Sequence, residues 1–205
     1  MEKVVDHHLS SCLYAFVMIG LKSYLPFLSS YFDLTEAALY ERQRALVRLG
    51  LLKATPGRGP GSGVRLTAEA VAALITSILM ADNWSDIDGR VAKMFNAGEA
   101  TDTTETTAPR KRKTFGSAFA ELLSAPSAAA EVEEIVVRRT STQAIIYFLS
   151  VKSFSFDKIG AENEPREFSA PARTSSGKHA LSVEARLNGG AIRDIAATLA
   201  KQDRS

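Results

Sequence analysis

The stretch from Pro56 to Gly63 constrains the fold more than any other part of the chain, because it holds four glycines and two prolines in eight residues. Proline lacks an amide donor and glycine weakens regular elements, so these residues predict a loop. The short apolar runs on either side, Leu51–Thr55 and Val64–Leu66, are typical of strands. The segment is therefore predicted to be a two-stranded hairpin with a glycine-rich tip.

Helices are predicted on both sides of this hairpin. Apolar residues recur at helical spacing over 5–22, a second short helix follows Pro26, and a third is predicted over 35–49. Gly50 provides the expected C-terminal stop of the third helix, and Thr67 provides the N-cap of the next one. The order is helix, helix, helix, strand, glycine-rich loop, strand and helix, which is typical of a winged helix-turn-helix.

Charge is distributed unevenly along the chain. From Arg42 to Arg65 there are six basic residues and no acidic one. Residues 114–205 carry 11 basic and 11 acidic side chains and are neutral. A polyanion would therefore be attracted to the first half of the chain.

Composition changes after Asn96 and divides the chain in two. Residues 97–113 contain no large apolar side chain and end in a basic run, so they predict a flexible linker. The fold class is predicted as α+β, with a winged helix-turn-helix domain over 1–96 and a small α/β unit over 114–205. The expected elements of the second unit are helix Phe115–Leu123, strands Val132–Arg138, Ala144–Val151, Phe154–Ile159 and Leu181–Leu187, a long polar loop over Ala161–Lys178, and a closing helix after Asn188.

The remaining composition argues for a protein of the reducing cytoplasm without chemistry of its own. Cys12 is the only cysteine, so neither an intramolecular disulfide nor a cysteine-based zinc site can form. The longest apolar run is too short to cross a bilayer, and the N-terminus lacks the basic start of a signal peptide. We identify no catalytic motif, metal site or cofactor site, and expect a binding protein rather than an enzyme or a membrane protein.

The residues around the hairpin also resemble a known family. Leu46-Val47-Arg48-Leu49-Gly50-Leu51-Leu52, then the Gly/Arg loop, then Val64-Arg65-Leu66-Thr67, is similar to the pattern of the MarR-like winged-helix regulators. The resemblance covers roughly residues 24–83. The proline- and glycine-heavy wing also resembles regulators carried by phages and gene-transfer elements. MarR-like proteins dimerise through long helices, whereas strands predominate in 114–205 of this chain.

The resemblance implies that the helix over 35–49 enters the major groove and that the wing over 53–66 lies on the backbone or in the minor groove. Glu36, Tyr40 and Gln43 would then face bases, and Arg44 would reach guanine or phosphate. Arg48, Lys53 and Arg65 would contact phosphates, and Arg58 would sit at the wing tip. The candidate DNA-binding residues are Thr35, Glu36, Tyr40, Gln43, Arg44, Arg48, Lys53, Arg58 and Arg65.

The predicted function is a sequence-specific transcription regulator that binds double-stranded DNA. A homodimer is expected, because one winged helix reads few base pairs, and residues 114–205 would supply the interface or bind a protein partner. An alternative is a winged-helix adaptor that binds RNA polymerase or a phage protein without DNA. An enzyme with its chemistry in 114–205 is the third interpretation, although no residues there suggest a reaction.

Overall fold

The computed structural model describes residues 19–57, 62–83, 87, 89–100, 113–149, 165–170 and 183–202. The fold is mixed α+β, as predicted. The elements of the first half are η1 (Leu21–Tyr24), α1 (Leu25–Phe32), α2 (Glu36–Arg48), β1 (Ala54–Thr55), β2 (Gly63–Val64), α3 (Ala68–Met80) and α4 (Gly89–Phe95). Those of the second half are β3 (Gly98–Glu99), α5 (Phe115–Ser124), α6 (Pro126–Ala130), β4 (Val132–Arg138), β5 (Gln143–Phe148), β6 (Arg166–Ser169), β7 (Glu184–Asn188) and α7 (Gly189–Gln202).

Local signals explain where the helices of the first half begin and end. The Thr35 side chain accepts a hydrogen bond from the Ala38 amide and caps α2, and Thr67 does the same for α3 through the Ala70 amide. Gly50, which follows the end of α2, has φ +73°, a conformation that side chains with a Cβ rarely adopt. The predicted helix boundaries on either side of the hairpin are therefore confirmed.

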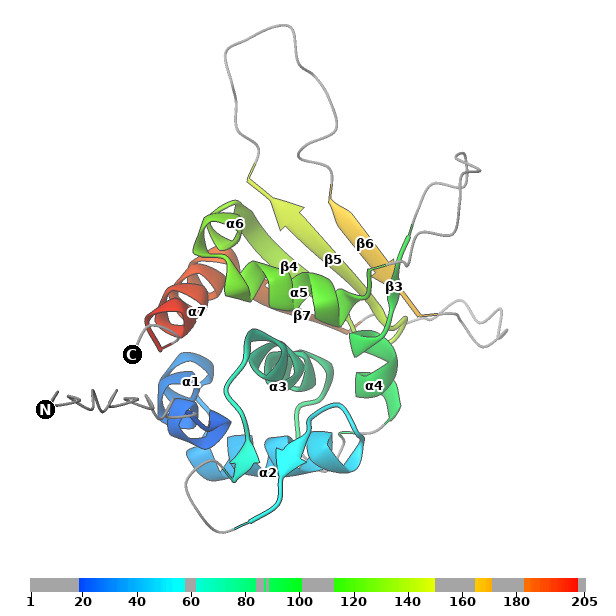
Figure 1. The fold of residues 1–205 in the computed structure, drawn as a ribbon. Coiled ribbons are helices and arrows are strands. Elements are labelled where there is room, and N and C mark those ends of the chain that lie inside the picture. Colours follow the sequence, from blue (N-terminus) through cyan, green and yellow to red (C-terminus); the bar gives the residue numbers. More distant parts are fainter. Residues whose placement is uncertain are drawn as a thin grey trace, which may run out of the picture.

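Two sheets are present among the described strands. β1 and β2 form the predicted antiparallel hairpin, although it is shorter than expected. The second sheet has the order β3-β6-β5-β4-β7 and is antiparallel throughout. In Figure 1, α5 and α7 cover one face of this sheet, and α3 lies between the sheet and α2.

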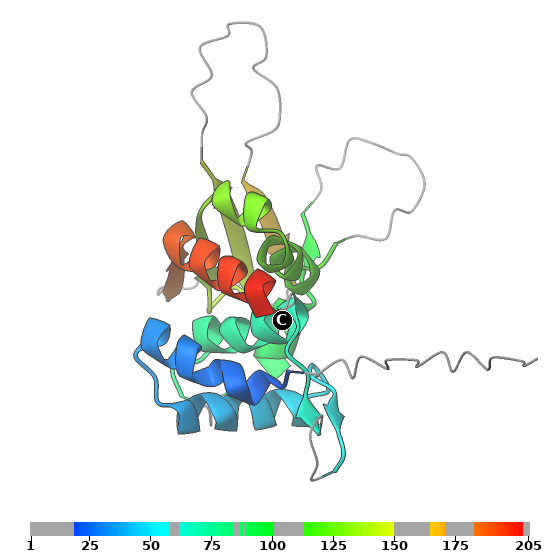
Figure 2. The same cartoon turned by 60° about the vertical axis from the view of Figure 1, so that its left-hand side comes forward.

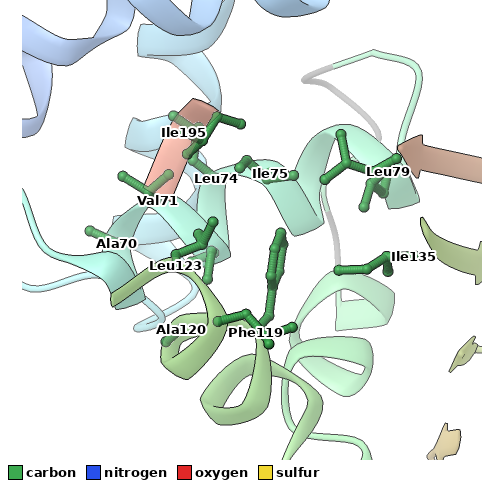
Figure 3. Packing of buried hydrophobic residues seen from close by; sticks show 14 of the residues in the cluster. Ala70, Val71, Leu74, Ile75, Leu79, Phe119, Ala120, Leu123, Ile135 and Ile195 are labelled. Carbon is green, nitrogen blue, oxygen red and sulfur yellow. The ribbon is translucent and has the colours of Figure 1, made fainter. Parts of the chain in front are cut away.

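Helix α3 is the centre of the core and joins the two halves of the chain. Ten of its 13 residues are buried, from Ala70 to Met80. Figure 3 shows Phe119 of α5 directed toward α3, with Ile195 of α7 and Ile135 of β4 at the margins of the same cluster. One hydrophobic cluster therefore spans the boundary that the sequence suggested between residues 1–96 and 114–205.

Helix α1 is also tied to the second half of the chain. The Tyr24 hydroxyl donates to the carbonyl oxygen of Ile195 in α7 at 3.2 Å, and burial raises the pKa of Tyr24 above its ordinary value. The Tyr31 hydroxyl donates to Asp194 at 2.5 Å, and this hydrogen bond raises the pKa of Tyr31 as well. These contacts hold η1 and α1 against α7, which is far from them in the sequence.

The predicted linker differs from the structure at both of its ends. Ala97 is buried, and Gly98–Glu99 form β3, which pairs with β6. The Glu99 amide donates to the Lys113 carbonyl at 3.1 Å and Gly98 forms an antiparallel bridge with Thr114, so the chain after residue 112 lies beside β3. Composition could not predict this, because so short a strand is stabilised by its neighbours rather than by its own apolar side chains.

Other elements differ from the prediction or lie outside the described residues. Helix α6 and strand β6 were not expected, since β6 falls in a polar stretch that suggested a loop. The predicted helix over 5–22 and a predicted strand over 154–159 lie largely or wholly outside the described residues. In the described part of the chain, no helix is long and apolar enough to span a bilayer.

Candidate nucleic-acid interface

The exposed face of α2 points away from the rest of the molecule. In Figures 1 and 2, α2 and the β1–β2 hairpin lie together at the end of the molecule opposite the five-stranded sheet. Leu39 and Leu46 of α2 are fully buried against the core. The exposed residues of the helix are Glu36, Ala37, Tyr40, Arg44 and Arg48, and Thr35 is exposed at its start.

The hairpin adds two cations beside this helix. In the register of β1 and β2, Ala54 pairs with Val64, and the residues next to that pair are Lys53 and Arg65. The side chains of Lys53 and Arg65 are exposed, whereas that of Val64, one residue nearer the tip of the hairpin, is buried. Arg65 also forms an antiparallel bridge with Gly20, and the Leu66 amide donates to the Ile19 carbonyl at 2.9 Å. At the base of the hairpin, the chain that leaves β2 is thus held by residues 19–20.

Lys22 is a residue of this surface that the sequence prediction missed. Its ammonium nitrogen lies 5.5 Å from the centre of the Tyr40 ring, within the range of a cation–π interaction. This contact connects η1 with α2, and the bridge from Gly20, the residue before η1, to Arg65 connects the same segment with the hairpin. The sequence pattern placed Lys22 in a long predicted helix over 5–22, and this helix gave no reason to expect Lys22 next to Tyr40.

The cations of this surface differ in whether an acid neutralises them. Arg44 has a 61% exposed side chain and forms an ion pair with Glu41 at 3.0 Å. Arg48, Lys53 and Arg65 are exposed and have no ion-pair partner within the described residues. We name these three side chains the open cation cluster. It lies at the C-terminal end of α2 and at the base of the hairpin, whereas Glu36 and Glu41 lie in the first half of the helix.

Two residues of the basic stretch are turned into the protein. Gln43 is 6% exposed, so it does not lie on the open face where the prediction put it, and within the described residues its Oε1 has no hydrogen-bond partner. Arg42 is 2% exposed and donates to the Ser77 carbonyl at 2.8 Å and the Asp82 carbonyl at 2.6 Å. Arg58, the predicted wing-tip contact, lies outside the described residues.

Arg42 shares its target with an arginine from the sheet. Arg139, in the turn after β4, donates from Nε to the Leu79 carbonyl at 2.6 Å and from Nη1 to the Asp82 carboxylate at 2.6 Å. Both guanidinium groups therefore satisfy carbonyl groups at the C-terminal end of α3, where the helix dipole favours positive charge. Arg42 and Arg139 thus connect the C-terminal end of α3 to α2 and to the turn after β4.

Within the described residues there is no cluster of histidine, cysteine or acidic side chains able to hold a metal ion. A cavity of about 40 Å³ lies where Leu66, Leu123 and Leu199 meet, and no titratable side chain lines it. Its size is far below that of a typical ligand pocket. The exposed cations at α2 and the hairpin carry positive charge that could neutralise an anion placed against this surface.

Comparison with known proteins found no matching family model, no matching curated protein and no matching solved structure.

Proposed function

We propose that the protein binds double-stranded DNA as a transcription regulator, through a winged helix formed by α1, α2 and the β1–β2 hairpin. The turn between α1 and α2, the hairpin after α2 and the bridge from Gly20 to the hairpin support this arrangement. They are consistent with the resemblance to MarR-like regulators. Such a regulator would act in the cytoplasm.

The observation that carries the proposal is the open cation cluster. An exposed arginine or lysine without an acidic partner can take up a phosphate without first breaking an ion pair. Each phosphate that such a cation neutralises also releases condensed counterions from the duplex. Arg48, Lys53 and Arg65 come from two neighbouring elements on one surface, which suits a phosphate backbone that passes along it.

In this proposal, side chains of the first half of α2 contact the bases. Tyr40, 39% exposed, and Glu36 lie on the open face, and Arg44 follows one turn after Tyr40. Arg44 would have to exchange Glu41 for a guanine or a phosphate, which is inexpensive because a surface ion pair of this kind contributes little. Gln43 is left out, because its side chain is buried.

The test is the affinity of the full chain for duplex DNA of random sequence. We expect the variant Arg48→Gln/Lys53→Gln/Arg65→Gln to bind about 100-fold more weakly than the parent at low salt, since it loses three phosphate contacts. The matched control is Arg193→Gln, which removes an exposed arginine of α7 that also lacks an ion-pair partner within the described residues. The proposal fails if the triple variant and the control bind equally well.

The charge of the first half of α2 favours the alternative function, an adaptor that does not bind DNA. Glu36 and Glu41 place negative charge on the half of α2 that would face bases, and the exposed Tyr40 ring beside them is suited to a protein contact. An adaptor for RNA polymerase or a phage protein would show no binding to duplex DNA, even at low salt. The same titration therefore separates the two functions.

A further inference from the structure

One edge of the five-stranded sheet is formed by β7, whose outward backbone groups have no hydrogen-bond partner among the described residues. In the described part of the chain, β7 pairs with β4 and has no strand on its other side. The Arg139 amide donates to the Val183 carbonyl at 2.9 Å, which shows that the backbone of Val183 faces β4. Because the direction alternates along a strand, Glu184 and Arg186 direct their amide and carbonyl groups outward.

The side chains along this edge follow the same alternation. Glu184 and Arg186 share the face of the sheet that α5 and α7 do not cover, and they form an ion pair with each other at 3.2 Å. Leu187 is buried on the opposite face, below the helices, and Val183 lies on that face too but is 38% exposed. The edge thus offers one acid, one base and one exposed apolar side chain at fixed positions.

We infer that β7 pairs with β7 of a second copy of this chain, antiparallel and with the two-fold axis at Ala185. In this register Glu184 faces Arg186 of the second copy, and the symmetry repeats the contact. Val183 faces Leu187 of the second copy on the helix-covered side. Each Glu184–Arg186 pair exchanges two backbone hydrogen bonds, because both residues direct their groups outward.

Charge selects this register over its neighbours. Pairing with the axis at Glu184 brings two carboxylates together, and pairing with the axis at Arg186 brings two guanidinium groups together. Like charges directly opposite each other destabilise a strand pair, whereas opposite charges stabilise it. Charged side chains on an edge strand often prevent association, but an acid and a base two residues apart on one face are complementary to themselves.

The existing ion pairs are compatible with the contact. Arg138 on β4 binds Glu184 at 2.9 Å, and Arg186 reaches Glu134 on β4 at 3.3 Å. These contacts hold Glu184 and Arg186 in position from the inner strand. The second copy would continue this alternation of charge across the edge. The inference does not depend on DNA binding, since α2 and the hairpin take no part in it.

The test is sedimentation equilibrium of the full chain at concentrations up to about 0.5 mM, because so small an interface is weak. We expect the parent to form dimers. Glu184→Arg places arginine opposite Arg186 of the second copy, and Arg186→Glu places glutamate opposite Glu184. Each variant alone should dimerise at least about tenfold more weakly. An equimolar mixture of the two should dimerise again, since the mixed pair restores opposite charges at both contacts.

Three results would each overturn the inference: a parent that stays monomeric, single variants that associate like the parent, or a mixture no more associated than its components. Circular dichroism of each variant checks that the sheet is intact. If a charge variant fails to fold, Arg186→Pro takes its place. Its missing amide is one that points outward, so the pairing with β4 keeps its hydrogen bonds while the proposed interface loses one. A dimer unaffected by this substitution would also contradict the inference.

Discussion

The arginines on and beside the five-stranded sheet have surroundings opposite to those of the open cation cluster. Arg138, Arg139, Arg166 and Arg186 each bind a carboxylate, at distances from 2.6 to 3.3 Å. The open cation cluster has no acidic partner within the described residues. The difference separates cations that an acid of the protein already neutralises from cations that can take up an anion without first breaking an ion pair. A count of basic residues in the sequence does not make that distinction.

We expect the deletion of residues 114–205 to have the largest effect on the protein. The contacts of α3 with α5 and α7 would be lost, and several fully buried side chains such as Leu74 and Ile75 would be exposed. Each costs about 1.5–3 kcal/mol, so the sum approaches the whole stability of a domain. We expect the fragment 1–113 to show no cooperative thermal transition by circular dichroism. A sharp transition would mean that the basic surface belongs to an independent domain after all.

Arg42 and Arg44 provide the sharpest pair of variants, since they lie two residues apart on one helix. Arg42→Met should lower the free energy of unfolding by about 2–3 kcal/mol, because it leaves carbonyl groups at the end of α3 without their charged donor. Arg44→Met should change it by less than about 0.5 kcal/mol. Urea denaturation measures both. Equal effects would show that burial does not distinguish the two side chains.

Arg44→Ala tests the role of the exposed arginine in recognition. The substitution should relax the preference at one base pair by up to about tenfold and leave binding to random duplex nearly unchanged. A selection from a library of random duplexes, carried out with parent and variant, gives the two preferences. An identical base preference in parent and variant would show that Arg44 does not contact a base.

The smallest effect concerns pH and the paired region. Hydrogen bonds from Arg138, and secondarily from Arg186, hold the pKa of Glu184 below its usual range. A lowered pKa in the folded state contributes stability above the ordinary pKa of glutamate, and that contribution is lost as pH falls through the folded pKa. Glu184→Gln should therefore be slightly less stable than the parent at neutral pH, and the difference should vanish in acid. Thermal melts across this range measure it.

Parts of the fold and site could be predicted because their signals are local. The Thr35 cap, the Gly50 stop and strand Val132–Arg138 agree with the structure residue by residue. The burial of Arg42 and Gln43 also had a signal, since both lie three or four residues from Leu39 and Leu46 on the core stripe of α2. Treating all the arginines as one basic face obscured it.

The remaining features depend on contacts between distant residues. The position of α3 depends on Phe119 and Ile195. Because α3 is apolar on all sides, its own sequence does not indicate which later helices pack against it. Strand β3 exists because β6 is beside it, and Lys22 joins the surface because Tyr40 is within reach. A single sequence contains no direct record of such pairs.

The salt dependence of binding to duplex DNA measures whether the open cation cluster contacts phosphates. The logarithm of the binding constant should fall linearly with the logarithm of salt concentration for the parent. For Arg48→Gln/Lys53→Gln/Arg65→Gln the slope should be less steep by about 2 to 3, close to 0.9 for each lost phosphate contact. A slope equal to that of the parent, or a parent that does not bind duplex at low salt, would contradict the account.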